Sequence, residues 1–252
     1  MKQSAIKLSG YFLLFLMLLG TTSMAQHKNK ILVFCKTSGF HHDAIEEGKT
    51  ALLLLGKEHD FDVDTTTDAS KFNKETLDQY AAVVFLNTTG DVLNPEQEKA
   101  FEQYIKAGNG FAGIHAATDT EYKWPWYGNL VGAYFVSHPK QQVATLNVVN
   151  KKTIATSHLP KEWSRKDEWY NFNWMTSEKL NVLITIDENS YDAGTGKMGK
   201  YHPLSWYHNF DGGRSFYTEL GHTKESYADP LFLRHVLGGL QYAMGLKKME
   251  GK

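Results

Sequence analysis

The stretch GNGFAGIHAATDT (residues 108–120) decides the predicted fold, because it joins a buried strand to a turn of small residues. GFAGIH (110–115) is an apolar run of strand length that ends on a histidine. In an open parallel sheet, ligands bind outside the carboxyl ends of the strands. Gly113 and Ala116 flank His115 and leave room for a close approach of the backbone to a ligand. We therefore predict that His115 stands at a functional edge of a parallel sheet.

The segments before this stretch alternate between strand and helix patterns. Strands are predicted over residues 30–36, 61–66 and 81–87, and helices over residues 43–59, 74–80 and 94–108. The helix over 94–108 has the clearest boundaries, with Asn94 as its cap, Pro95 in its first turn and Gly108 at its end. This order predicts an α/β fold, a three-layer sandwich with a mainly parallel central sheet.

The second half of the chain is predicted to be richer in strands. These cover residues 141–149, 181–187, 203–210 and 214–220, and a closing helix over 230–245 begins with a proline. No repeat or linker interrupts this half, so we predict one domain over residues 26–252.

The N-terminal residues 1–25 are predicted to be a signal peptide. A short basic region precedes the apolar run LSGYFLLFLMLL (8–19), and the small residues of SMA (23–25) favour cleavage before Gln26. The run is shorter than the ~20 residues that a membrane span needs. We therefore expect a periplasmic or secreted protein with no membrane span after cleavage.

The composition excludes several classes of function. The net charge of −1, from 27 basic and 28 acidic residues, argues against a nucleic-acid partner. The chain has neither a G-x-x-x-x-G-K-[ST] phosphate loop nor a G-x-G-x-x-G motif after its first predicted strand. Its single cysteine, Cys35, lies inside an apolar run, which predicts an unreactive core thiol.

Histidines follow three of the predicted strands at the edge where His115 lies. His41 and His42 follow the first strand, and His222 follows the strand over 214–220. Neighbouring side chains diverge, and we favour His42 because a helix N-terminus follows it and adds a positive field. His42, His115 and His222 would act as acids and bases near neutral pH or hold a divalent metal such as zinc.

The histidines also have structural interpretations. Any one of them could simply fill a turn and bond to backbone. The chain has no H-x-x-x-H or H-x-H spacing, so metal ligands would have to come from distant loops. His138 and His202 each precede a proline; they would either rim the site or, as we favour, initiate turns.

Candidate carboxylates and substrate-binding groups are harder to place. Asp167 and Glu168 lie among aromatic residues, where a carboxyl group gains a raised pKa and can serve as a general acid or base; a solvated acidic turn is the alternative. Arg214 would anchor an anionic group or form a strand-end salt bridge. The six tryptophans would pack the core or stack on sugar rings.

Four segments together resemble the ThuA-like (trehalose utilisation) family. They are KILVFCKTSGFHHDAI, GNGFAGIHAATDT, DEWYNF and GGRSFYTELGHTKESYADPLFLRHVLGGLQYAMG, and the resemblance covers about residues 29–246. It implies a flavodoxin-like sandwich similar to class I glutamine amidotransferase domains. The positions that match the family's motifs are His42, His115, Glu168, Arg214, Tyr217 and His222.

The resemblance also implies a role in carbohydrate metabolism, beside sugar oxidoreductases that make 3-keto sugars. Glutamine amidotransferases carry a cysteine in a G-I-C-x-G turn, where this chain has His115. An imidazole does not easily replace a thiolate as acyl acceptor, and Cys35 lies elsewhere, so we exclude glutamine hydrolysis.

We therefore predict an exported enzyme that acts on a sugar or keto-sugar glycoside by histidine acid/base or metal-assisted chemistry, as a hydrolase, lyase or isomerase. The alternatives are a non-catalytic carbohydrate-binding protein and an accessory protein of a sugar oxidoreductase. The expected catalytic residues are His42, His115, Glu168 and His222, and the expected substrate-binding residues are Asp119, Trp124, Trp206, Arg214 and Tyr217.

Overall fold

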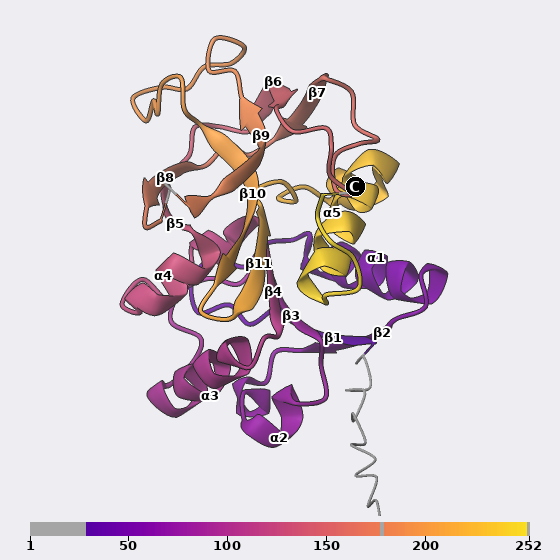
Figure 1. Ribbon diagram of the computed structural model, residues 1–252. Coiled ribbons are helices and arrows are strands. Elements are labelled where there is room, and N and C mark those ends of the chain that lie inside the picture. The colour runs from indigo at the N-terminus through magenta and orange to yellow at the C-terminus, as the bar shows by residue number, and fades with distance from the viewer. Residues whose placement is uncertain (1–28, 177–178, 251–252) are drawn as a thin grey trace, which may run out of the picture.

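The computed structural model describes residues 29–176 and 179–250, and one long sheet runs through it (Figure 1). In spatial order its nine strands are β2 (Asp62–Thr66), β1 (Lys30–Phe34), β3 (Ala82–Leu86), β4 (Gly110–Ile114), β11 (Gly213–Thr218), β10 (Pro203–Phe210), β9 (Asn181–Ile186), β6 (Gln142–Val148) and β7 (Glu162–Asp167). Strands β2 to β11 in this order pair in parallel, and those from β11 to β7 pair antiparallel. A small second sheet joins β5 (Ala133–Ser137) to β8 (Asn171–Trp174).

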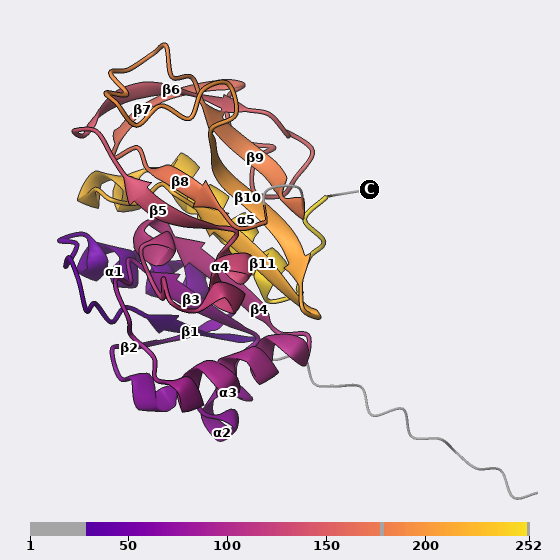
Figure 2. The same cartoon turned by 90° about the vertical axis from the view of Figure 1, so that its left-hand side faces the viewer.

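Helices cover both faces of the parallel half of the sheet. The helices are α1 (Ile45–Glu58), α2 (Lys74–Leu77), α3 (Pro95–Lys106), α4 (Pro125–Val131) and α5 (Pro230–Ala243). Helices α1 and α5 lie on one side of the sheet, and α2, α3 and α4 lie on the other (Figures 1 and 2). The predicted α/β fold class is confirmed.

The continuous apolar runs of the sequence form the centre of the sheet. Every residue of β3 and β4 is buried, as expected for strands covered by helices on both faces. Gly110 lets α5 approach β4 closely, because a Cβ atom there would lie 1.9 Å from the carbonyl oxygen of Ala243. The core therefore lies between the parallel strands and the two helix layers.

The predicted start of α3 is confirmed in detail. The Asn94 side chain accepts hydrogen bonds from the backbone N–H groups of Glu96 and Gln97, at 3.1 and 3.0 Å. The Gln97 side chain accepts in return from the Asn94 N–H at 2.9 Å. This reciprocal pair is a capping box, which satisfies donors that the first helical turn leaves free.

Other local predictions were wrong. Helix α1 begins at Ile45, after Ala44 and without a side-chain cap, so Asp43 is not its N-cap. Strands β5, β7 and β8 and helix α4 were not predicted at all.

Two further sequence expectations concern the single cysteine and the N-terminal segment. Cys35 is 3% exposed, and burial raises the pKa of its thiol, which agrees with an unreactive core residue. The predicted signal peptide, residues 1–25, lies outside the described residues. In the part of the chain that the structure describes, no helix has the length and apolar character needed to cross a membrane.

Candidate functional site

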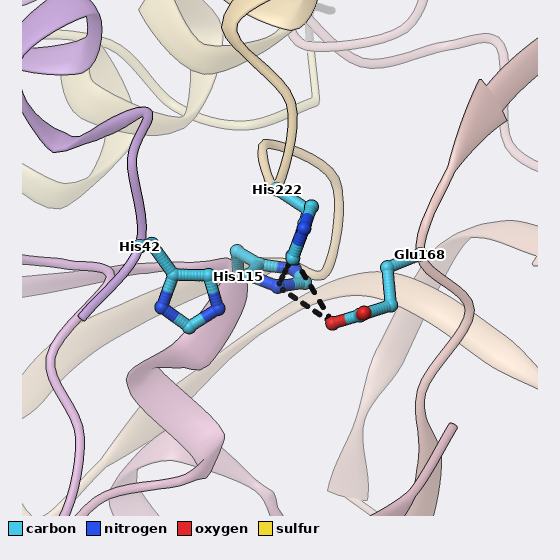
Figure 3. Close-up of side chains that lie close together, drawn as sticks. All are labelled: His42, His115, Glu168 and His222. Atoms are coloured by element: carbon cyan, nitrogen blue, oxygen red, sulfur yellow. Dashed lines mark hydrogen bonds and ion pairs between the residues drawn. The ribbon is translucent and has the colours of Figure 1, made fainter. Parts of the chain in front are cut away.

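The four predicted catalytic residues meet at the carboxyl end of the parallel strands (Figure 3). His42 lies in the segment after β1, His115 follows β4, His222 follows β11, and Glu168 follows β7. Each offers a nitrogen or oxygen atom, and these atoms all lie within 4.8 Å of one another. We call these four residues the His/Glu cluster.

A strained turn presents His115. Its φ of +49° lies in the left-handed region, where a residue other than glycine costs about 1–3 kcal/mol. The Tyr217 hydroxyl donates to the His115 carbonyl oxygen at 2.8 Å and holds this turn from beneath. Tyr217 is fully buried and supports the turn that carries His115.

The orientation of the His115 ring fixes which nitrogen is free. Its Nδ1 lies 2.6 Å from the Glu219 carbonyl oxygen, which can only accept a hydrogen bond. Nδ1 therefore carries the proton, and Nε2 presents a lone pair when the ring is neutral. Such a bond from the second ring nitrogen is what fixes the tautomer of metal-binding histidines.

The distances within the His/Glu cluster fit a bound metal ion. His115 Nε2 lies 3.1 Å from His222 Nδ1 and 3.5 Å from Glu168 Oε2, and the last two atoms are 3.1 Å apart. Nitrogen and oxygen ligands about 2.0–2.1 Å from a tetrahedral zinc ion are about 3.3–3.4 Å from each other. The three donor atoms are therefore spaced as ligands of one ion.

His42 completes the group. Its ring centroid lies 4.9 Å from that of His115 and 5.1 Å from that of His222. Its Nδ1 is buried and has no hydrogen-bond partner among the described residues. Burying a polar atom without a hydrogen-bond partner costs free energy, so the position of the His42 ring also favours a ligand-binding site.

The charges in the cluster attract a cation. Burial, together with the charges of the nearby His115 and His222, lowers the pKa of His42 to about 2. Burial alone would raise the pKa of Glu168, but hydrogen bonds with His115 and His222 outweigh it and hold that pKa well below its usual range. Neutral imidazole and ionised carboxylate are the forms that bind metals.

The pKa of His222 shifts in the opposite direction. Burial lowers its pKa, but the hydrogen bond and charge of Glu168 outweigh burial and raise the pKa above its usual value. The Glu168 carboxylate therefore favours the charged form of His222.

Two residues lie at the rim of the cluster: His138, for which a rim position was the less favoured alternative, and Gln141, which sequence reasoning missed. His138 was expected to initiate a turn, yet its Nδ1 lies 3.2 Å from Glu168 Oε1 while its side chain remains 41% exposed. The Gln141 amide lies 2.7 Å from His222 Nε2. Both residues lie in the connection between β5, which ends at Ser137, and β6, which begins at Gln142. His202, by contrast, is fully buried and contacts Glu188.

The tryptophans that were expected to bind substrate lie in the core. Trp206 is fully buried and its Nε1 donates to the Val131 carbonyl oxygen at 2.8 Å. Trp124 is 8% exposed and stacks on Trp126. Both rings therefore pack in the core of this structure.

Arg214 and Asp119 lie at different distances from the end of the sheet that carries the cluster. Arg214 pairs with Gly110 at the start of β11, the end of the strand remote from the cluster, and donates to the Ala243 carbonyl oxygen at 3.0 Å. Arg214 therefore lies outside the His/Glu cluster. Asp119 is half-buried in the loop after His115 and accepts a hydrogen bond from Tyr122 at 2.6 Å. Burial raises the pKa of Asp119, against the opposing effect of the Tyr122 hydrogen bond.

The family model ThuA, described as trehalose utilisation, matches residues 30–243. A protein described as ThuA-like from Bacteroides uniformis has a similar structure, with 24% identity, coverage of 88% of this chain and 93% of that one, and a TM-score of 0.73. Another from Parabacteroides merdae has 22% identity, coverage of 88% and 92%, and a TM-score of 0.72.

A more distant structural match is a β-galactosidase from Bacillus circulans sp. alkalophilus. The match has 12% identity, covers 87% of this chain but 31% of that one, and has a TM-score of 0.56. These three structures share the fold of this chain. The comparison with curated proteins gave no match.

Proposed function

The chain belongs to the ThuA family, described as trehalose utilisation, and from that premise we propose that it is a metal-dependent enzyme acting on a sugar or keto-sugar glycoside. The observation that carries the proposal is the convergence of lone pairs in the His/Glu cluster. His115 Nε2 lies 3.5 Å from a Glu168 carboxylate oxygen, and when the His115 ring is neutral, a cation bound between these two acceptors would remove their repulsion. The site would hold the ion through His42, His115, Glu168 and His222.

The donor set indicates the kind of metal. Three imidazoles and one carboxylate suit zinc and other first-row divalent ions, whereas magnesium and calcium prefer all-oxygen sites. A metal of this kind supplies Lewis acidity, which polarises a carbonyl or hydroxyl oxygen of a bound sugar.

Residues around the cluster would handle protons and hydroxyl groups. His138 contacts Glu168 and is 41% exposed, so it can exchange protons between a bound sugar and solvent. Asp119, held by Tyr122, can accept hydrogen bonds from sugar hydroxyls. A keto-sugar glycoside needs proton abstraction beside its carbonyl group to isomerise or to eliminate its substituent, and these groups supply the base.

The burial of Trp124 and Trp206 weighs against the alternative of a carbohydrate-binding protein that uses tryptophans. We further propose that the protein is exported with Gln26 as its first residue and that a sugar oxidoreductase supplies the keto-sugar. N-terminal sequencing of protein from a periplasmic extract checks the first point.

The test is turnover of trehalose and of its 3-keto derivative by chelator-treated protein, with and without Zn²⁺, Mn²⁺ or Co²⁺, followed by mass spectrometry. We expect metal-dependent turnover that His115→Ala lowers at least about 100-fold. The matched control is His41→Ala, which removes an exposed histidine of the same loop as His42. Turnover that survives both chelation and His115→Ala would refute the metal-dependent mechanism, and an absence of turnover would favour the binding alternative.

A further inference from the structure

We propose that Asp167 is the positioning residue of the His/Glu cluster: its buried carboxylate joins the loop that carries His222 to the strand end that carries Glu168. The bound metal in this inference rests on the proposed function, whereas the contacts of Asp167 do not depend on it.

The Asp167 side chain accepts five hydrogen bonds and is fully buried. Its Oδ1 accepts from the backbone N–H groups of Glu168 at 3.1 Å and His222 at 3.2 Å. Its Oδ2 accepts at 3.1 Å from Gly221 N–H, from the Ser226 hydroxyl and from the Arg165 guanidinium. Two of the four residues of the cluster therefore have their backbone tied to one carboxylate.

The sheet itself does not bring these two residues together. Glu168 follows β7, the edge strand, and His222 follows β11, with three other strands between them in the sheet. The His222 loop spans the gap between β11, which ends at Thr218, and a 3-10 helix that begins at Lys224. The contacts of Asp167 thus supply a link that the strand order lacks.

An amide cannot replace this carboxylate. All five contacts are donors, so Asp167→Asn would turn its –NH₂ group toward N–H or O–H groups whichever way it rotates. With –NH₂ in the place of Oδ1 it would lose Glu168 and His222; in the place of Oδ2 it would lose Gly221, Ser226 and Arg165. Leaving such buried donors unpaired disturbs the backbone of the cluster.

Asp229→Asn is a matched control. Asp229 is the other carboxylate that contacts Arg165, at 3.4 Å, and it caps α5 through the Leu231 N–H at 2.9 Å. Asparagine also caps helices well, and Asp229 is not among the donors or acceptors that contact the cluster backbone. The control therefore removes an ion pair of Arg165 and leaves the cluster intact.

The first measurement is the affinity for Co²⁺ together with its visible absorption spectrum. We expect Asp167→Asn to weaken binding about 10- to 100-fold and to change the spectrum, as for other residues that orient metal ligands. Asp229→Asn should keep the wild-type spectrum and an affinity within about threefold. Wild-type affinity and spectrum in a folded Asp167→Asn would overturn the inference, as would an equal loss in the control.

The second measurement is hydrogen exchange of residues 219–223 in metal-free protein, which needs no metal. We expect faster exchange in Asp167→Asn and unchanged exchange in Asp229→Asn. If the wild type binds no Co²⁺, the proposed function fails and exchange alone decides the inference. If Asp167→Asn does not fold, Ser226→Ala, which removes one contact of Oδ2, should give a smaller effect in the same direction; no effect there would overturn the inference.

Discussion

A left-handed backbone aims the side chain of His115 into the cluster. Its φ is +49°, and the cost of that conformation is offset by the Tyr217 hydroxyl on its carbonyl oxygen and by its own bond to the Glu219 carbonyl. The ring is thereby oriented before any ligand arrives. Strain held in place by buried hydrogen bonds is common at sites that must be preorganised.

Gly221 is a second residue whose backbone conformation serves the site. Its φ of +117° is nearly restricted to glycine, and a Cβ atom would lie 2.9 Å from the Tyr227 hydroxyl. We predict that Gly221→Ala lowers the free energy of unfolding by about 2–4 kcal/mol and weakens metal binding, because the adjacent His222 must shift. Urea unfolding and a metal titration measure the two effects.

Gly194→Ala is the control for that prediction. Gly194 also has a positive φ, +62°, but no atom lies within 4 Å of its added Cβ. The loss should be about 1 kcal/mol, with metal affinity unchanged. Equal losses of unfolding free energy in Gly221→Ala and Gly194→Ala would show that the close contact at Gly221 does not add to the destabilisation.

At this scale, strand-end position predicted His42, His115 and His222 as candidates, because parallel strands end at one edge. The core position of Trp206 and the rim position of His138 were each one of two alternatives, because sequence neighbours do not reveal the burial of β10 or the contact of His138 with Glu168.

Helix α5 packs against the sheet through a buried histidine. His235 is fully buried, its Nδ1 donates to the Ala155 carbonyl oxygen at 2.9 Å, and its Nε2 lies 3.1 Å from the Ser205 hydroxyl. Burial and the charges of His158 and Arg165 lower its pKa to about 4, against the opposing effect of the Ala155 hydrogen bond. The interface therefore contains a neutral imidazole.

That histidine makes the stability depend on pH. Between its unfolded pKa of ~6.5 and its folded pKa, the unfolded chain binds the extra proton, so stability falls as the pH falls. We predict that His235 accounts for a loss of about 2 kcal/mol between pH 7 and pH 5. Urea unfolding of His235→Gln at both pH values should show a drop smaller by that amount. Identical drops in wild type and variant would contradict the assignment.

Elements with a clear period or cap could be predicted, and those without could not. The apolar runs of β3 and β4 and the capping box of α3 are local signals. Strand β7, with the sequence EWSRKD, shows no apolar alternation strong enough to mark it, and it exists because β6 pairs with it. Helix α4 is short, and its N-cap residue, Trp124, makes no side-chain capping hydrogen bond, so no local signal marks its start.

On the scale of the whole molecule, the cluster joins the two halves of the sheet. The parallel strands supply His42, His115 and His222, and the antiparallel half supplies Glu168 (Figure 3). The family resemblance predicted the general architecture, but sequence alone did not predict the antiparallel extension that brings Glu168 to the site. A ligand that holds all four residues should therefore stabilise the entire domain.

We predict that a saturating metal raises the thermal midpoint. At a free concentration about 1,000 times Kd the ion stabilises the folded state by about 4 kcal/mol, or about 10 °C for a domain of this size. A chelator should reverse the shift in differential scanning fluorimetry. His115→Ala should show a shift below about 2 °C, and a full shift in that variant would place the metal elsewhere.

The most direct test of the central claim is a calorimetric titration of metal-free protein with Zn²⁺. The account predicts one ion per chain in the wild type and in His41→Ala, and binding at least about 100-fold weaker in His115→Ala and Glu168→Gln. A wild-type chain that binds no Zn²⁺, Co²⁺ or Mn²⁺, or variants that bind as tightly as the wild type, would contradict it.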